Sequence, residues 1–455
     1  MAGFFLVLAF LAFLGFAWGP RAAKTGSLEL YAVFCLLSGL LVVHCWLSLL
    51  SLADIEWSGP SVALPLLLAG ALFAWRRRRS PRSSAATRRP AALGFGDAIA
   101  LLAIAAFALC AWRQWIVTSD FFYHWGVKGE KFFLARGIDA HYLRGPLAIA
   151  VWYPTLLPEL HALTALARGR FDAHEMMAWS ALWLALLWLA ARGVLRAMPV
   201  ERRLGQAGIG AVLALCVAAG ISVRLAGGAD WIVALALVVG AAALLAEPTG
   251  DWDPALAVAA ATAAAAKTEG VVLAALLLGL DLARRALQRP RRFRPCWLAS
   301  LGPSLLVVAL WIAQSTRAGL WPHELSAAPR EWHVREWLGT FDLQFLSGAA
   351  PTFYLPALLL LIPLLFVRRT TRWLGLALTL QLAFYEAVYL TSRGSPELYV
   401  RTTFARLAFQ LLPALVVGFV AMTANGEGRA SPGSPCPRAG GAAPGPTRGL
   451  RRSPS

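Results

Sequence analysis

The first candidate for chemistry is a carboxylate, Asp120, in the segment TSDFFYHWGVKGEKFFLA at 118–135. The segment directly follows an apolar run, so this carboxylate is placed where the chain would leave a bilayer. There it could accept a proton from an attacking hydroxyl or amine. Asp120 and His124 are four residues apart and would share one face of a helix. In the alternative interpretation Asp120 only caps the helix and its neighbours form a solvated face.

The same segment has the pattern of an amphipathic helix. At about 100° per residue its aromatic residues fall in one arc. They are Phe121, Phe122, Trp125, Phe132 and Phe133. The other side holds Asp120, Tyr123, His124, Glu130 and Lys131, with Lys128 at the border. This pattern predicts a helix that lies in the membrane–water interface.

Further ionisable residues border the apolar runs. Asp230 follows Gly227-Gly228-Ala229 and opens a run, either as a functional group or as a helix N-cap. Lys267 and Glu269 lie between two runs. Residues two apart do not face each other on a helix, so we expect a separate partner for each, such as an anionic headgroup for Lys267. The alternative is a short polar turn.

Two arginines stand near the last apolar run, Arg401 just before it and Arg406 inside its pattern. Burying a guanidinium there is costly, so Arg406 should face a cavity or an anion. The planar fork of an arginine suits a phosphate. The alternative is that the side chain snorkels to lipid headgroups.

Several other kinds of site lack a signature. The histidines and nearby acids have no compelling metal-ligand spacing and form no HExxH, so no metal ligand is predicted, although a divalent metal stays an open alternative. The six cysteines form no CxxC and suggest neither a disulfide framework nor a zinc site. The chain has no Walker loop and no GxGxxG, which argues against a nucleotide-driven pump.

The composition indicates a polytopic α-helical membrane protein. Of 455 residues, 58% are hydrophobic and 15% charged, against about 25% charged in soluble domains. A span needs about 20 apolar residues. We expect about thirteen spans, near 2–18, 28–53, 61–75, 94–117, 173–191, 206–222, 230–246, 254–266, 268–283, 298–316, 352–367, 373–391 and 402–424. The net charge of +18 is better explained by arginine in cytoplasmic loops than by nucleic-acid binding.

The positive-inside rule predicts how these spans are oriented. No Lys or Arg precedes residues 2–18, which therefore read as a first span with an outside N-terminus rather than a cleaved signal peptide. Alternating thirteen spans from there puts the arginine clusters inside. The outer loops are then 118–172, 223–229, 317–351 and 392–401.

We expect three parts. Residues 1–93 form N-terminal spans with a basic cytoplasmic loop, and residues 94–424 form the main membrane domain with the outer loop 118–172. The tail, 425–455, is rich in Gly, Pro, Ser and Arg and is predicted to be disordered in the cytoplasm.

Four stretches in this order resemble a known family. They are Asp120 with FFYHWGVKGEKFF, WYPTLLPELHAL at 152–163, GGAD at 227–230 with AKTEG at 266–270, and RTTFARLAFQLLP at 401–413. Over roughly 115–413 the chain resembles the bacterial GT-C superfamily of membrane glycosyltransferases, in particular its RgtA/B/C/D-like and dolichyl-phosphate-mannose mannosyltransferase-like members. The family usually has a second acid beside the first, which is missing here. It also commonly has one span before this loop, where this chain has three in addition.

The resemblance implies a GT-C-like fold and a hexosyltransferase-type activity. The donor would be a sugar on a polyprenyl phosphate, and transfer would occur on the periplasmic face of the bacterial inner membrane to a glycan, lipid or protein acceptor. Asp120 matches the acidic residue that is implied to activate the acceptor. The implied substrate- and donor-phosphate-binding residues are His124, Lys128, Tyr153, Glu159, His161, Asp230, Lys267, Glu269, Arg401 and Arg406.

The residue types fit that reaction independently, because transfer from a lipid phosphate needs a base for the acceptor and cations for the departing phosphate. Asp120 could serve as the base, and Lys267, Arg401 or Arg406 could hold the phosphate. Three alternatives stay open: a transporter or lipid flippase with a charged pathway, an oligosaccharide polymerase or ligase, and a purely structural membrane protein.

Overall fold

The computed structural model describes residues 1–19, 27–79, 92–146, 148, 151, 153–246, 253–288, 295–320, 332–341, 344, 354–391 and 395–423. These residues form helices and one isolated β-bridge, with no strand among them, which confirms the all-α class. Contacts group Met1–Ala424 into one compact unit. The predicted boundary between 93 and 94 stays a prediction, and the predicted disordered tail lies outside the described residues.

Every apolar run predicted from the sequence contains a helix. The long helices are α1 (Ala2–Trp18), α2 (Leu28–Leu52), α3 (Leu64–Arg79), α4 (Phe95–Trp112), α8 (Ala173–Ala197), α9 (Arg202–Ser222), α10 (Asp230–Leu245), α11 (Pro254–Ala266), α12 (Thr268–Gln288), α13 (Gly302–Arg317), α17 (Tyr354–Leu364), α18 (Arg372–Leu390) and α19 (Pro396–Met422). Between them lie η2 (Gly59–Ala63), η3 (Phe121–Trp125), α5 (Gly126–Ala135), α6 (Ala140–Arg144), α7 (Leu156–Arg168), η5 (Pro295–Leu301) and α15 (Val334–Gly339).

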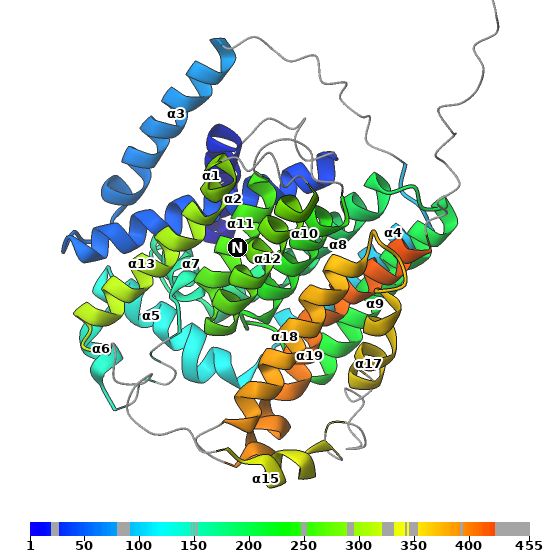
Figure 1. Cartoon of the computed structure of the whole chain (residues 1–455). Helices are drawn as coiled ribbons and strands as arrows, with labels where there is room; N and C mark the ends of the chain where they lie inside the picture. Colours follow the sequence, from blue (N-terminus) through cyan, green and yellow to red (C-terminus); the bar gives the residue numbers. More distant parts are fainter. Residues whose placement is uncertain are drawn as a thin grey trace, which may run out of the picture. The chain divides into compact units, whose positions relative to one another are not determined.

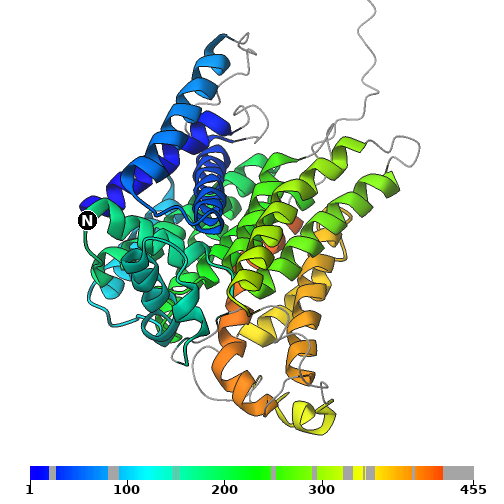
Figure 2. The ribbon, with the colours of Figure 1, turned by 90° about the vertical axis from the view of Figure 1, so that its left-hand side faces the viewer.

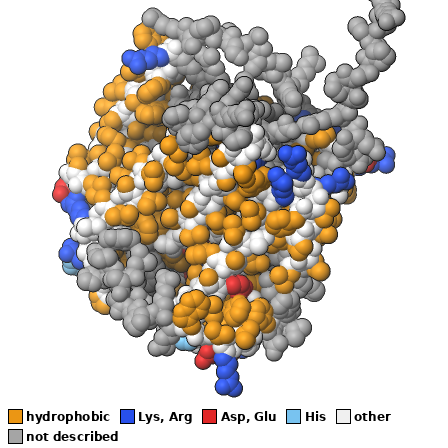
Figure 3. Space-filling view, viewed as in Figure 1, with side chains coloured by type: hydrophobic (Ala, Val, Ile, Leu, Met, Phe, Trp, Pro, Cys, Tyr) orange, Lys and Arg blue, Asp and Glu red, His pale blue; other side chains and the backbone are white. Residues whose placement is uncertain are grey.

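Eight helical segments within the described ranges are long and apolar enough to cross a membrane. Three more apolar helices, α1, α10 and α11, are shorter than that criterion. A multi-pass membrane protein follows, whereas the count of thirteen spans stays a prediction. Apolar side chains also cover most of the face in Figure 3, as expected of helices that meet lipid.

Two groups of polar contacts mark opposite ends of the helices. At one, the Asp97 end, the start of α2 meets the end of α8 through Glu29 and Arg192, and Asp97 at the start of α4 meets Gln206 at the start of α9. At the other, the Asp230 end, the start of α10 meets the end of α11 through Asp230 and Lys267. Helices α2, α4 and α9 therefore start at the Asp97 end, where α8 ends, and α10 starts at the Asp230 end, where α11 ends.

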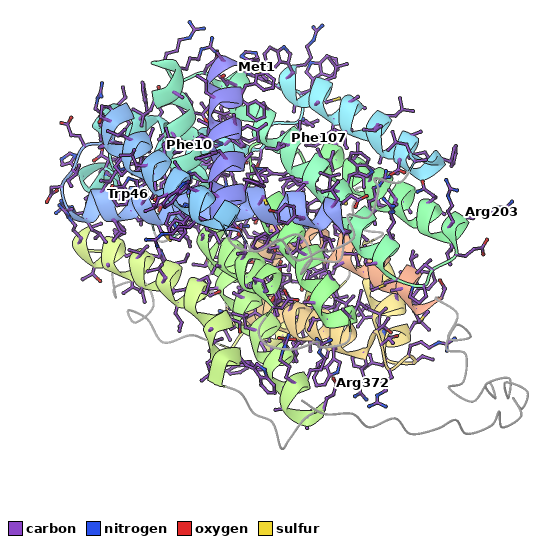
Figure 4. The ribbon with its side chains drawn as sticks, turned by 90° about the horizontal axis from the view of Figure 1, so that it is seen from above. Met1, Phe10, Trp46, Phe107, Arg203 and Arg372 are labelled. Carbon is purple, nitrogen blue, oxygen red and sulfur yellow. The ribbon has the colours of Figure 1, made fainter. Side chains whose placement is uncertain are left out.

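The views from different sides agree with this arrangement. Trp46, towards the end of α2, and Arg203, at the start of α9, lie at opposite sides of Figure 4. Helices α10, α11 and α12 lie in the middle of Figure 1, and α10 packs against α8, α11 and α19. Helix α3 lies at the periphery in Figures 1 and 2. The interior is therefore built around α10, and its first residue is the centre of the candidate site.

Candidate functional site

The candidate site begins with a carboxylate that has no access to solvent. Asp230, the first residue of α10, is 0% exposed. Its two oxygens accept hydrogen bonds from Lys267 Nζ (3.1 Å), Arg406 Nη2 (2.9 Å) and Nε (3.3 Å), and Gln410 Nε2 (2.7 Å). The N-cap of α10 is Ala229, so Asp230 does not cap the helix. A buried carboxylate with two cationic partners stays ionised, because its charge is neutralised where water is excluded.

Arg406 connects this buried acid to a more exposed one. Its Nη2 lies 2.9 Å from Asp230 Oδ2 and 2.7 Å from Asp120 Oδ2. The Asp120 side chain is 30% exposed and that of Arg406 17%. Arg406 therefore has the buried anionic partner expected of it, together with a second anion at the surface of the site.

Lys267 forms the other side of the network. Its Nζ lies 2.5 Å from Glu269 Oε1 and 5.9 Å from the centre of the Tyr153 ring. The expectation that Lys267 and Glu269 would not meet was wrong, because Lys267 is not helical. Its φ of −154° and ψ of 156° make it an extended residue between α11 and α12, and that geometry turns its side chain towards both Asp230 and Glu269. The negative charge of Glu269 and burial raise the pKa of Tyr153, which is therefore a neutral phenol.

Backbone contacts hold Asp120 beside this network. After α4, Thr118 N donates to Ala226 O (2.9 Å) and Ala226 N donates to Ile116 O (3.1 Å). The chain then turns at Gly227, whose φ is +84° and whose N donates to Ser180 Oγ. A Cβ at Gly227 would lie 2.9 Å from the Phe121 side chain. The glycine thus lets the GGAD turn approach the residue that follows Asp120.

A glycine also allows the close approach of α11 and α12. A Cβ at Gly270 would lie 1.9 Å from Ala263 O, in the backbone of α11. Only a residue without a side chain lets the first turn of α12 pack there. The AKTEG stretch predicted as a polar turn is therefore a tight reversal that buries Lys267.

The segment after Asp120 is helical but faces differently from the prediction. It begins with the π-helical turn η3 and continues as α5. Phe121, Trp125 and Phe132 are buried inside the protein, whereas Phe122 is exposed. His124 and Lys128, which the wheel placed on or next to the polar side, are buried as well. The segment packs on α7, and the π-turn changes the angle per residue, so a regular wheel misplaces its faces.

His124 reaches the network through aromatic stacking. Its ring lies 3.8 Å from the ring of Trp125 and 5.3 Å from that of Tyr153, which in turn covers Lys267. Lys128 is 1% exposed, and burial lowers its pKa to about 7. Its predicted role in binding donor phosphate stays a prediction.

Three other predicted residues are placed away from the network. Glu159 binds His44 Nδ1 (2.7 Å), Ser48 Oγ (3.2 Å) and Thr155 Oγ1 (2.7 Å), which ties α7 to α2. His161 lies beside the Phe121 ring, and burial lowers its pKa to about 4, so it is neutral. Arg401 is exposed and pairs with Glu397 one turn earlier in α19.

Sequence inspection missed Gln410 and Tyr385. Gln410 Nε2 donates to Asp230, and Tyr385 of α18 donates to Gln410 Oε1 (2.7 Å). A signal was available for Gln410, since it lies four residues after Arg406 in an apolar run and must share its helix face. Nothing in the sequence distinguishes Tyr385 from other interfacial aromatic residues.

The formal charge of the site is negative. Asp120, Asp230 and Glu269 contribute −3, while Lys267 and Arg406 contribute +2, leaving −1. Within the described ranges, no group of three or more His, Cys, Asp or Glu side chains is arranged to hold a metal ion. The arrangement therefore offers one accessible carboxylate and two cations as its reactive groups.

Comparison with known proteins gave no relative. No protein-family model, curated protein sequence or solved structure matches the chain.

Proposed function

We propose that the chain is a membrane glycosyltransferase that transfers a sugar from a polyprenyl-phosphate donor to an acceptor at the Asp230 end, on the periplasmic face of a bacterial inner membrane. The observation that carries this proposal is the pairing of the exposed Asp120 with Arg406, itself anchored on the buried Asp230. Asp120, the proposed base for the acceptor hydroxyl or amine, lies in direct contact with Arg406, the proposed cation for the departing phosphate. Both groups are needed for this transfer.

The network also bears on the missing second acid of the sequence pattern. No acid stands directly beside Asp120 in the sequence, but Asp230 and Glu269 join its network from other elements. Asp230 is fully buried and saturated with donors, so it acts as the anchor of Lys267 and Arg406 rather than as a phosphate ligand. In the proposed reaction Asp120 takes the proton of the acceptor while the cations hold the departing lipid phosphate.

The proposal is tested by mass spectrometry of lipid-linked and envelope glycans in a wild-type strain, a deletion strain, and the deletion strain carrying Asp120→Asn. A matched control carries Glu397→Gln, which removes an exposed carboxylate that pairs with an arginine of the same helix. We expect a sugar to disappear with the deletion and with Asp120→Asn, at equal membrane abundance, and to stay with the control. A sugar lost only in the deletion strain would remove the proposed role of Asp120.

One observation favours a transporter or lipid flippase as the second candidate. Helices α10 and α11 have 16 and 13 residues, or about 24 and 20 Å at 1.5 Å per residue, less than the roughly 30 Å of a hydrocarbon core. Arg406 lies ten residues into α19, about 15 Å from its start. The network is thus recessed among the helices, as along a substrate pathway. Glycans that are unchanged in every strain would favour this function.

A further inference from the structure

The charge balance of the network raises a problem for any phosphate ligand. With its groups ionised, the network already carries −1, and a phosphodiester would bring the total to −2. Arg406 is also engaged by two carboxylates at once. The two carboxylates occupy the edge of Arg406 formed by Nε and Nη2, so an incoming phosphate can bind this edge with two hydrogen bonds only if one of these contacts is released.

The two contacts of Arg406 are unequal. Asp230 is inaccessible and receives both Nε and Nη2, so releasing it would leave a buried carboxylate short of a cation. Such a loss is costly, because a buried charge without its partner keeps its desolvation penalty. Asp120 is 30% exposed and receives only Nη2, so water can replace that contact. Asp120 is therefore the partner that is cheaper to release.

We propose that Arg406 exchanges Asp120 for the phosphate of the donor while it stays bonded to Asp230. The inference rests on the proposed function, and it adds an order of events. Before the donor binds, Arg406 is paired with the carboxylate of Asp120, which is therefore occupied and not open to the acceptor. The donor phosphate draws the guanidinium away, and Asp120 becomes available to the acceptor only then. The exchange only makes and breaks hydrogen bonds and ion pairs, so no covalent bond is formed or broken and no electron is transferred.

The exchange predicts that replacing one residue of the site increases the affinity for the ligand, whereas such a substitution usually decreases it. Because Asp120 competes with phosphate for Arg406, Asp120→Asn should bind the lipid phosphate more tightly than the wild type does, by about three- to tenfold. Arg406→Gln should weaken binding by about tenfold or more. In the double variant the gain from Asp120→Asn should vanish, since no arginine remains to be released.

The test measures binding of a polyprenyl phosphate to the full-length protein in nanodiscs of neutral lipid, with the four proteins of this double-mutant cycle. A polyprenol without the phosphate shows whether the phosphate is recognised. Arg196→Gln is the matched control, because Arg196 is a partly exposed arginine that pairs with a carboxylate at the Asp97 end. It should bind as the wild type does.

The outcomes separate the exchange from the proposed function. If Asp120→Asn increases the affinity for the lipid phosphate only when Arg406 is present, the exchange is supported. If Asp120→Asn increases the affinity for the lipid phosphate equally with and without Arg406, the effect is general repulsion between Asp120 and phosphate, and the exchange is overturned. No increase in affinity would overturn it as well. In both cases the proposed class of donor would be unaffected. A wild-type protein that binds the phosphate no better than the polyprenol would overturn both proposals.

Discussion

A cluster of charges around a buried aspartate stands at each end of the helices, and the two clusters differ in their charge balance and in the kind of group that reaches the surface. At the Asp97 end, Asp97 is 0% exposed and binds Arg192 Nη1 (2.7 Å), Trp188 Nε1 (3.0 Å), Gln206 Nε2 (3.2 Å) and Gly94 N (2.9 Å). Glu29 pairs with Arg192 and with Arg196. Two acids and two arginines balance to zero. This cluster joins the ends of α2, α4, α8 and α9.

The Asp230 end is built from similar residue types but presents mainly a carboxylate at its surface, whereas the most exposed group of the Asp97 cluster is the cation Arg196 (31%). Its charges sum to −1 rather than zero, and one carboxylate, Asp120, reaches the surface. Its groups come from α10, α12, α19 and the segments that hold Asp120 and Lys267, and helices α10 and α11 stop short of a full bilayer thickness. The Asp97 cluster thus joins four helices in charge balance, whereas the Asp230 end holds an excess carboxylate beside Arg406.

The largest expected effect is the difference in stability lost when Asp97 and Asp120 are each replaced. Asp97→Ala should destabilise the protein by roughly 3 kcal/mol, because Arg192 loses its best partner in a buried position. Asp120→Ala should cost no more than about 1 kcal/mol, since Arg406 keeps Asp230 and water replaces the lost contact. Thermal unfolding of both variants in the same detergent compares them. Equal losses would remove the distinction between the two ends.

The next effect concerns the pH dependence of stability that the buried Lys128 should cause. Burial lowers the pKa of Lys128 to about 7, from 10.5 for an exposed lysine. Between these values the unfolded chain holds the proton more tightly, so stability rises as the pH increases from about 7 to about 10.5. Lys128→Met should abolish this rise and raise the melting temperature more at pH 7.5 than at pH 10. A pH dependence of stability that is the same in wild type and variant would contradict the burial of a charge here.

The smallest effect is expected where a salt bridge faces solvent. Arg401→Gln breaks the pair with Glu397, whose two side chains are more than half exposed. The free energy of unfolding should change by less than about 0.5 kcal/mol, and sugar transfer should be unchanged. Urea-induced unfolding and the glycan profile provide the measurements. A loss of transfer would restore Arg401 to the phosphate-binding residues inferred from the sequence.

The helices were predictable because their signal is local. Apolar runs with polar ends define them, and even the short runs 230–246 and 254–266 are helices α10 and α11. The parts of the network that border such runs could be found for the same reason. Asp230, Lys267 and Arg406 each interrupt or open an apolar pattern, and all three meet.

What could not be predicted depends on local irregularity and on distant partners. The π-turn at 121–125 changes which side chains of 118–135 face inward, and the extended backbone of Lys267 lets it meet Glu269. Glu159 resembled a site residue in sequence, but its partners His44 and Ser48 lie more than 100 positions earlier. Arg401 and Arg406 looked alike in sequence, and only packing separates them.

The long separation between Arg406 and its partners has a consequence for biogenesis. Asp230 and Lys267 belong to neighbouring helices and can pair as soon as α10 and α11 have been inserted. Arg406 is made 139 residues after Lys267, which at about 5–20 residues per second means roughly 7 to 28 seconds later. During that interval the nascent protein holds Asp120 without its cation. Helix α19, which leaves the ribosome after α10 and α11, therefore completes the charge network, and a chain truncated before α19 would enter the membrane without the cation that joins Asp120 to Asp230.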